Sequence, residues 1–489
     1  MTRPDRTLGR PFLPAALAAA LLAAGCSLAP TYERPAAPVP TTFPGDPAQP
    51  GGRAAAETPW QQFFTDPRLA GLIDTALANN RDLRVAAQNI EQARAQFGVQ
   101  RAALFPAVGV TASGSRSEPN PARAYRDDAG KVSSSYSVNL GMTAWEIDFF
   151  GRIRSLSDAA LARYLATEET MRATQISLVA AVATGWLTLV ADEELLAITR
   201  QTLATREDTL KLTKLRFDNG VASDLDYQAA NSLAESARAT YAQQQRLRRQ
   251  DENALALLLG APVPAGALAG LEGGLRSLTP MPDVPAGLPS DLLAERPDIR
   301  AAEQQLVAAN ANIGAARAAF FPRVALTTSV GTVSSQFDNL FHSGTRAWAF
   351  SPQLTLPIFT AGANQANLDA ARAAREIAVA EYEKSIQSAF REVADALAGR
   401  ETLTEQARAL DATAQAERRR FELSDLRYRN GVASSLDLLD AQRSLFAAQQ
   451  QAVQARLQEL QNRVTLYKVL GGGWTATEAP SAQQQQPAT

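Results

Sequence analysis

The chain has 489 residues, of which 46% are hydrophobic but only 7% aromatic, and its formal net charge is −2 at pH 7. So few aromatic side chains argue against one compact core, whereas stretches rich in Ala, Leu, Gln, Glu and Arg are typical of long packed helices. The absence of a basic stripe argues against a nucleic-acid partner. The single cysteine, Cys26, and the single histidine, His342, exclude an internal disulfide and a Cys/His metal cluster. We therefore predict no metal, no cofactor and no enzyme activity.

Residues 1–25 have the features of a lipoprotein signal peptide. Arginines precede an apolar run at 12–24, which is too short to span a bilayer. Small residues stand directly before Cys26, an arrangement in which the thiol is lipidated and the chain is cut before it, although alanine replaces the usual leucine of this motif. A plain signal peptide with an incidental cysteine is the alternative. We favour lipidation because Cys26 lies at the cleavage point, and Ser27 favours onward transport to the outer membrane.

Residues 26–59 are rich in Pro, Ala and Thr and are predicted to form a lipidated, extended tether. No apolar run of 18 or more residues follows, so we expect no transmembrane helix. The last segment, 475–489, contains four consecutive glutamines and is predicted to be disordered.

Between these ends the chain repeats itself, and we predict two structural repeats at 60–270 and 271–474. Short motifs recur in the same order, which makes chance an inadequate explanation. The matching pairs are 82–84 with 298–300, 102–106 with 318–322, and 219–223 with 430–434. Each repeat is therefore predicted to run helix, two strands, long helix, tight turn, helix.

The long helices are predicted over 152–217 and 362–428, which contain no proline. Apolar residues recur every seven positions from Val182 to Phe217, as in a coiled-coil seam. At 1.5 Å per residue each long helix reaches about 100 Å. The shorter predicted helices are 81–103, 221–259, 298–319 and 432–470. One short pair placed end to end nearly matches one long helix, so we predict a helical wall of uniform height.

Four segments alternate apolar and polar side chains: 108–115, 136–144, 324–330 and 348–358. Such segments are typical of outer-membrane strands, although a half-buried strand in a soluble sheet has the same period. The lipidation motif favours the membrane interpretation. Four strands cannot close a barrel, and an open edge would leave unpaired backbone groups in lipid. Several copies must therefore associate, and this reasoning leaves two, three or four copies open.

The combined motifs resemble the TolC/OprM-like outer membrane efflux family, in its NodT-type lipoprotein branch. The residues that carry the resemblance are Gly25-Cys26 with the segment 30–35, the segment 295–299, the doubled Asn-Gly-Val-Ala-Ser turn and the segment 436–441. The resemblance implies a homotrimer with a twelve-stranded β-barrel, four strands per chain, on a long α-helical barrel. It implies a passive exit duct for antibiotics or other toxic small molecules, lipid-anchored in the outer membrane and extending into the periplasm. The implied partners are a periplasmic adaptor (membrane fusion) protein and an RND-type inner-membrane pump.

The two Asn-Gly turns are expected at the periplasmic tip. Gly220 and Gly431 can adopt the left-handed conformation that ends a helix, and Ser223 and Ser434 are expected to cap the returning helices. The resemblance implies that the adaptor docks on these turns, where small residues allow close helix approach. The implied docking residues are Arg216, Gly220, Val221, Ala222, Ser223, Arg427, Gly431, Val432, Ala433 and Ser434.

By the same resemblance, Asp437 and Asp440 line the closed aperture of the tip. Carboxylates from three chains would there raise one another's pKa values and attract cations. Helix capping is the alternative, and it accounts for Asp437 better than for Asp440. The resemblance also assigns Asp226 and Tyr428 to a latch of hydrogen bonds between hairpins. Ala433 stands where a known latch pattern has arginine, and Arg427 is either its substitute or a solvated side chain.

Two other functions fit parts of the sequence. One is a duct for type I protein secretion, against which the lipidation motif and the Pro-rich mature start argue. The other is a non-conducting coiled-coil spacer of the envelope, which would have no lipid-facing strands. Because the pump selects the cargo in such systems, the sequence leaves open the exported substrate, the identity of pump and adaptor, and the ion or pH dependence of gating.

Overall fold

The structure is a computed structural model, and it describes residues 28–43, 55, 58–118, 132–271, 273–285, 292 and 295–473. Cys26, the predicted signal peptide and the predicted disordered tail lie outside these residues. The chain divides into two compact units. The first consists of Met1–Ala36, Ile90–Thr167 and Ala302–Tyr382, and the second consists of Ala37–Asn89, Glu168–Ala301 and Glu383–Thr489.

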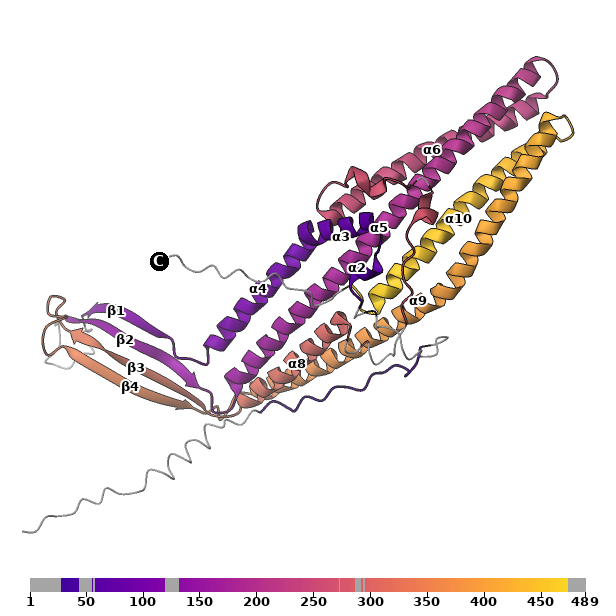
Figure 1. Cartoon of the computed structure of the whole chain (residues 1–489). Helices are drawn as coiled ribbons and strands as arrows, with labels where there is room; N and C mark the ends of the chain where they lie inside the picture. The colour runs from indigo at the N-terminus through magenta and orange to yellow at the C-terminus, as the bar shows by residue number, and fades with distance from the viewer. Residues whose placement is uncertain are drawn as a thin grey trace, which may run out of the picture. The chain divides into compact units, whose positions relative to one another are not determined.

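The elements follow one another in the predicted order, and the two long helices have 67 residues each (Figure 1). The first set comprises α2 (Trp60–Phe63), α3 (Pro67–Asn79), α4 (Arg81–Ala102), β1 (Val108–Ser117), β2 (Ser133–Ile147), α5 (Arg152–Asp218) and α6 (Asp224–Leu259). The second set comprises the 3-10 turns η2 (Ala265–Leu268) and η3 (Gly274–Ser277), then α8 (Pro297–Ala318), β3 (Arg323–Ser334), β4 (Arg346–Thr355), α9 (Ala363–Arg429) and α10 (Ser435–Val469).

Three predicted boundaries were wrong by three residues, each for a local reason. The returning helices α6 and α10 begin three residues after the predicted 221 and 432, because those residues still belong to the turns. Strand β4 ends at Thr355 rather than at 358, and the residue at position 357 is a proline, which cannot donate a ladder hydrogen bond.

The first unit contains one antiparallel sheet with the strand order β1-β2-β3-β4. Its register places one apolar residue of each strand in a single cross-strand row, formed by Val110, Leu140, Val330 and Trp348. The neighbouring row contains Thr111, Asn139, Gly331 and Ala347. Because side chains alternate between the faces of a strand, one face of this sheet is apolar and the other carries polar and small residues.

The N-terminal segment of the first unit, residues 28–36, contains no helix or strand, and it is fixed to α8. Arg34 donates to both carboxylate oxygens of Glu303 at 2.7 and 2.8 Å, and the Tyr32 hydroxyl donates to the same carboxylate at 3.0 Å. The Asn310 amide donates to the Pro30 carbonyl at 2.7 Å. Charge-assisted and paired hydrogen bonds of this kind hold a segment that has little apolar surface of its own.

The second unit has its core around the middle of α5. Trp186 is fully buried there, and its indole N–H donates to the Ala267 carbonyl at 2.9 Å. Leu255 and Leu259 of α6 are also fully buried. The predicted heptad seam is buried at Val182 and becomes exposed by Phe217, so the packing within one chain thins toward the turn.

Helix α5 departs from one expectation. By length and composition alone, it is apolar enough to cross a membrane, although no such helix was predicted after Cys26. However, 56% of its most apolar stretch is buried against the rest of the chain. A buried apolar stretch is what the central helix of a water-exposed helical bundle requires, so the core accounts for this composition.

Arg296 gives the segment 295–299 a structural role in the second unit. Its guanidinium is buried, and it pairs with Asp298 at 2.6 Å and with Glu392 of α9 at 2.9 Å. A further N–H donates to the carbonyl of Val469 at the end of α10, at 3.0 Å. One side chain therefore ties the beginning of α8 to α9 and α10. Two carboxylates and a carbonyl offset the cost of burying its charge.

Candidate functional site

Among the residues that the structure describes, none covers the apolar face of the four-stranded sheet. Val110 is 70% exposed and Trp348 is 76% exposed, although both are large apolar residues. Within the described residues, β1 and β4 pair on one side only, which leaves an open backbone edge on each. A broad exposed apolar surface indicates contact with a membrane or a partner, and open edges are templates for further strand pairing.

A charged cluster marks the place where the sheet meets α5. Glu146, near the end of β2, pairs with Arg152 at 2.8 Å and with Arg323 of β3 at 2.7 Å. Two residues later, the Asp148 carboxylate accepts a hydrogen bond from the backbone N–H of Arg154 at 2.8 Å. The cluster therefore stabilises both the sheet end and the first turn of α5, where backbone N–H groups lack helical partners.

The two hairpin turns have the conformation that the sequence predicts. Gly220 and Gly431 have φ values of +72° and +73°, which glycine adopts without steric cost. The N–H of Val221 donates to the carbonyl of Arg216 at 2.8 Å, and the N–H of Val432 donates to that of Arg427 at 2.9 Å. These bonds close the ends of α5 and α9 in the Schellman pattern.

Capping boxes begin the returning helices, which confirms the predicted caps. The Ser223 side chain accepts from the N–H of Asp226 at 3.1 Å, and the Asp226 carboxylate accepts from the backbone N–H of Ser223 at 3.2 Å. Ser434 and Asp437 form the same pair at the start of α10. Each box satisfies two N–H groups that would otherwise lack a partner. The turns themselves are exposed and carry apolar side chains, among them Val221, Leu225, Val432 and Leu436.

Asp226 connects the two hairpins of one chain. Besides capping α6, its other carboxylate oxygen accepts a hydrogen bond from the Ser435 hydroxyl at the start of α10. Hydrogen bonds from Ser435 and Ser223 lower the pKa of Asp226, because they favour the charged form. The structure therefore places Asp226 in a contact between the two hairpins.

Tyr428 contacts an arginine that belongs to the other hairpin. The Arg216 guanidinium of α5 lies 4.6 Å from the centre of the Tyr428 ring on α9, and Tyr428 is buried. This geometry is a cation–π contact. The arginine that contacts the Tyr428 ring is thus Arg216 from the other hairpin.

Asp437 and Asp440 have different local partners within the chain. Asp437 completes the capping box of α10, whereas Asp440 pairs with Arg420 of α9 at 2.5 Å. The side chain of Asp440 is about half exposed, so this pair contributes little to stability. Both carboxylates stand on the first turns of α10, at the turn end of the second hairpin.

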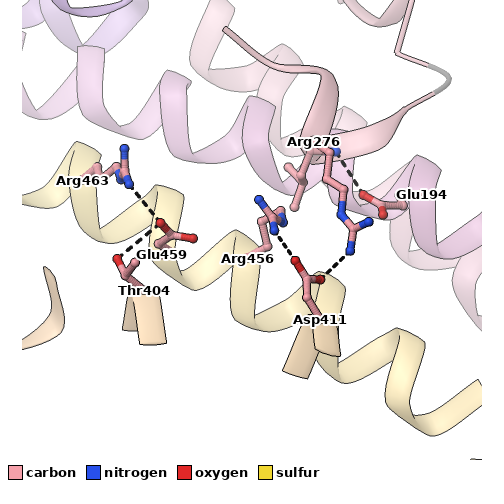
Figure 2. Close-up of polar contacts among 8 residues, drawn as sticks. Glu194, Arg276, Thr404, Asp411, Arg456, Glu459 and Arg463 are labelled. Atoms are coloured by element: carbon pink, nitrogen blue, oxygen red, sulfur yellow. Dashed lines mark hydrogen bonds and ion pairs between the residues drawn. The ribbon is translucent and has the colours of Figure 1, made fainter. Parts of the chain in front are cut away.

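A polar network that sequence reasoning missed joins η3 to three helices of the second unit (Figure 2). The Glu194 carboxylate of α5 accepts from the Leu275 N–H at 3.0 Å, and Arg276 pairs with Asp411 of α9 at 2.6 Å. Arg456 of α10 reaches the other oxygen of the same carboxylate. These residues lie far apart in the sequence and share no motif, so only the fold brings them together. No group of three or more His, Cys, Asp or Glu side chains that could hold a metal occurs within the described ranges.

The comparisons with known proteins agree with this architecture. Residues 72–261 and 288–472 match the sequence profile of the outer membrane efflux protein family. The toluene efflux pump outer membrane protein TtgC and the antibiotic efflux pump outer membrane protein ArpC, both of Pseudomonas putida, are each 49% identical over 469 residues, which span 95% of this chain and 96% of each relative. The open state of the MtrE outer membrane channel of Neisseria gonorrhoeae has a TM-score of 0.82 at 43% identity, covering 92% of this chain and 98% of that one.

Proposed function

The chain belongs to the outer membrane efflux protein family, and from this premise we propose that it is the exit duct of a tripartite pump for toxic organic molecules. Members of this family are conduits and not enzymes. The names of the relatives that match 95% of the chain refer to toluene and antibiotics. We infer the same substrate class here: small apolar solvents and amphipathic antibiotics.

The apolar face and open edges of the sheet carry this proposal. Four strands per chain become a closed barrel of twelve when three copies pair β1 of one with β4 of the next. Closure satisfies the edge N–H and C=O groups, places the apolar row in lipid and turns the polar row toward a water-filled lumen. The helices of the three copies, each of which contributes its two repeats, then form the helical barrel. A non-conducting spacer would have no use for the exposed apolar row.

Lipidation of Cys26 would anchor each copy in the outer membrane, with the helices extending into the periplasm. The exposed turns at Gly220 and Gly431 would then form the periplasmic tip and receive the adaptor protein, whose partner is an RND-type pump. The support for docking is the exposed apolar surface of Val221 and Val432, because apolar side chains on a solvent-facing turn favour a partner.

Gating is proposed to take place at the same tip. Asp226 with Ser435, and Tyr428 with Arg216, hold the two hairpins of one chain together in the closed state. Asp437 and Asp440 of three copies would converge on the axis as a ring of six carboxylates. Opening requires the hairpins to separate, so each latch contact favours the closed state by its own interaction free energy.

Export tests the proposal directly. In a strain that lacks its outer-membrane duct but retains pump and adaptor, the chain should restore tolerance to toluene and to a pumped antibiotic. The purified protein should run as a trimer and form ion-conducting pores in planar bilayers. Substituting Trp348→Glu and Val330→Glu in the apolar row should abolish assembly in the membrane, whereas Asn139→Glu on the polar face should not. A monomer that forms no pore would contradict the proposal.

A further inference from the structure

A groove of about 430 Å³ lies between α5 and the hairpin of α9 and α10, all within the second unit. Its floor and walls combine guanidinium groups with aromatic rings: Arg206 on α5, Arg418 and Phe421 on α9, and Phe446 on α10. The volume is within the range of small-molecule sites. Its lining shares no residue with the latch contacts, the proposed aperture or the sheet.

Arg206 is the unusual member of this group. Its side chain is only 4% exposed, yet among the described residues its Nε has no acceptor. Within the described part of the chain, its one side-chain hydrogen bond goes to the Leu233 carbonyl of α6, at 3.2 Å, and its guanidinium lies 5.2 Å from the centre of the Phe446 ring. Burial, and then the nearby cation of Arg443, lower the pKa of Arg206. Burying a guanidinium without a carboxylate partner costs desolvation free energy. A negatively charged group bound beside Arg206 would offset that cost.

The other charged residues of the groove do not supply that charge. Glu422 lines the groove, but Arg419 already donates to its carboxylate at 2.9 Å. Arg418 is exposed at the rim and adds a second cation. The groove thus presents cationic donors at its base and rim, and Phe421 and Phe446 provide apolar walls between them. A ligand that satisfies both features carries one anionic group on an apolar body.

We propose that this groove binds one amphipathic organic anion per chain, an aryl or alkyl carboxylate. The carboxylate would accept from Arg206 and Arg418, and the apolar body would lie against Phe421 and Phe446. Because the walls belong to both hairpins, an occupied groove would favour the arrangement in which the hairpins stay together. The site would therefore let an anionic amphiphile stabilise the closed duct.

The test uses the full-length protein in lipid nanodiscs, with empty nanodiscs as the blank for partitioning. The probe is 2-naphthoate, and its uncharged match is 2-naphthamide. Calorimetry should show saturable binding of naphthoate, one per chain, with naphthamide at least tenfold weaker, because a charge-assisted hydrogen bond is lost. Arg206→Gln, which keeps a donor but removes the charge, should weaken naphthoate binding at least tenfold.

The control variant is Arg408→Gln. Arg408 is an exposed arginine of α9 that pairs with Glu405 and lies outside the groove. This variant should bind naphthoate as the unaltered chain does. If Arg206→Gln fails to assemble, Arg418→Gln, at the exposed rim, should still show weakened binding. Equal binding of naphthamide, equal binding by both groove variants, or no saturable binding up to millimolar naphthoate would overturn the proposal. The last result is also what a groove filled by a neighbouring copy would give. Binding needs no open channel, so failure here leaves the proposed efflux function untouched.

Discussion

The carboxylate of Asp226 caps α6 and at the same time accepts a hydrogen bond from Ser435, the first residue of α10. One side chain thus serves a local and a long-range purpose. The local bond holds the turn of the first hairpin, and the long-range bond holds that hairpin to the second. Any movement that separates the hairpins must break the second bond, whereas the first lies within one hairpin.

Ser435→Ala therefore tests the latch without disturbing the cap. The substitution removes the bond between hairpins but keeps the capping box of Ser223 and Asp226. At this partly buried site the loss is about 1 kcal/mol, which corresponds to a roughly fivefold rise in open probability. Single-channel recording in planar bilayers measures it. Asp224→Asn, in the same first turn of α6, is the control and should leave opening unchanged. Equal opening of Ser435→Ala and the unaltered channel would argue against a latch here.

Two substitutions of Tyr428 distinguish the contribution of its ring to the closed state from that of its hydroxyl. Because Arg216 lies over the ring face, Tyr428→Phe should keep the closed state as it is. Tyr428→Leu should weaken it by roughly 0.5–2 kcal/mol, the range of a cation–π pair between exposed and desolvated surroundings. Open probability measured for both variants discriminates between ring and hydroxyl. If Phe opens the channel as much as Leu does, the hydroxyl, and not the ring, carries the latch.

The proposed carboxylate ring predicts a cation effect. Asp437→Ser with Asp440→Asn should raise conductance and reduce block by trivalent cations, because six negative charges leave the axis. Serine at 437 is chosen to limit damage to the first turn, since full loss of a cap costs about 1 kcal/mol. Asp425→Asn, which only breaks a pair with Arg429, serves as the matched control. Unchanged conductance together with unchanged cation block would count against the ring.

Asp192 predicts a pH dependence of stability. Burial, and then a hydrogen bond with the neighbouring Asp251, raise the pKa of Asp192 from 3.8 to about 7. Between these values the folded chain holds a proton that the unfolded chain has lost, so stability should fall as pH rises from about 4 to about 7. Above that range the contribution is constant.

Asp192→Asn should remove this contribution and raise the melting temperature at pH 8 relative to that of the unaltered chain. Gln244, which donates to Asp192 at 2.9 Å, can also hydrogen-bond to an asparagine. Melting of the helical circular dichroism signal at pH 5 and pH 8 gives the comparison, with the exposed Asp208→Asn as control. A pH profile that Asp192→Asn leaves unaltered would exclude a shared proton at this pair.

Features that depend on neighbouring residues were predictable from the sequence. The Asn-Gly turns, the caps at Ser223 and Ser434, and the strand alternation follow from φ preferences, capping and side-chain period, which act over a few residues. Family resemblance added the assignment of Asp226 to a contact between hairpins.

The contacts that cross the fold were not predictable. Arg216 and Arg427 occupy matching places before the two turns, and nothing in the sequence says which one faces Tyr428; only the packing of one hairpin on the other decides it. Likewise, Arg276 and Asp411 share no spacing rule. The unpaired Nε of Arg206 emerges only when α5, α6 and α10 are seen together.

The fastening of the N-terminal segment has a consequence for how the protein sits in a bilayer. Arg317 donates to the Leu28 carbonyl at 3.1 Å, so only Ser27 separates the proposed acylation site from chain that is already fixed to α8. One residue spans at most about 3.6 Å. Fatty chains on Cys26 would thus stay within a short, nearly fixed distance of α8 instead of being joined to it by a long flexible linker. Their insertion in the bilayer would therefore limit how deeply the first unit lies in the lipid.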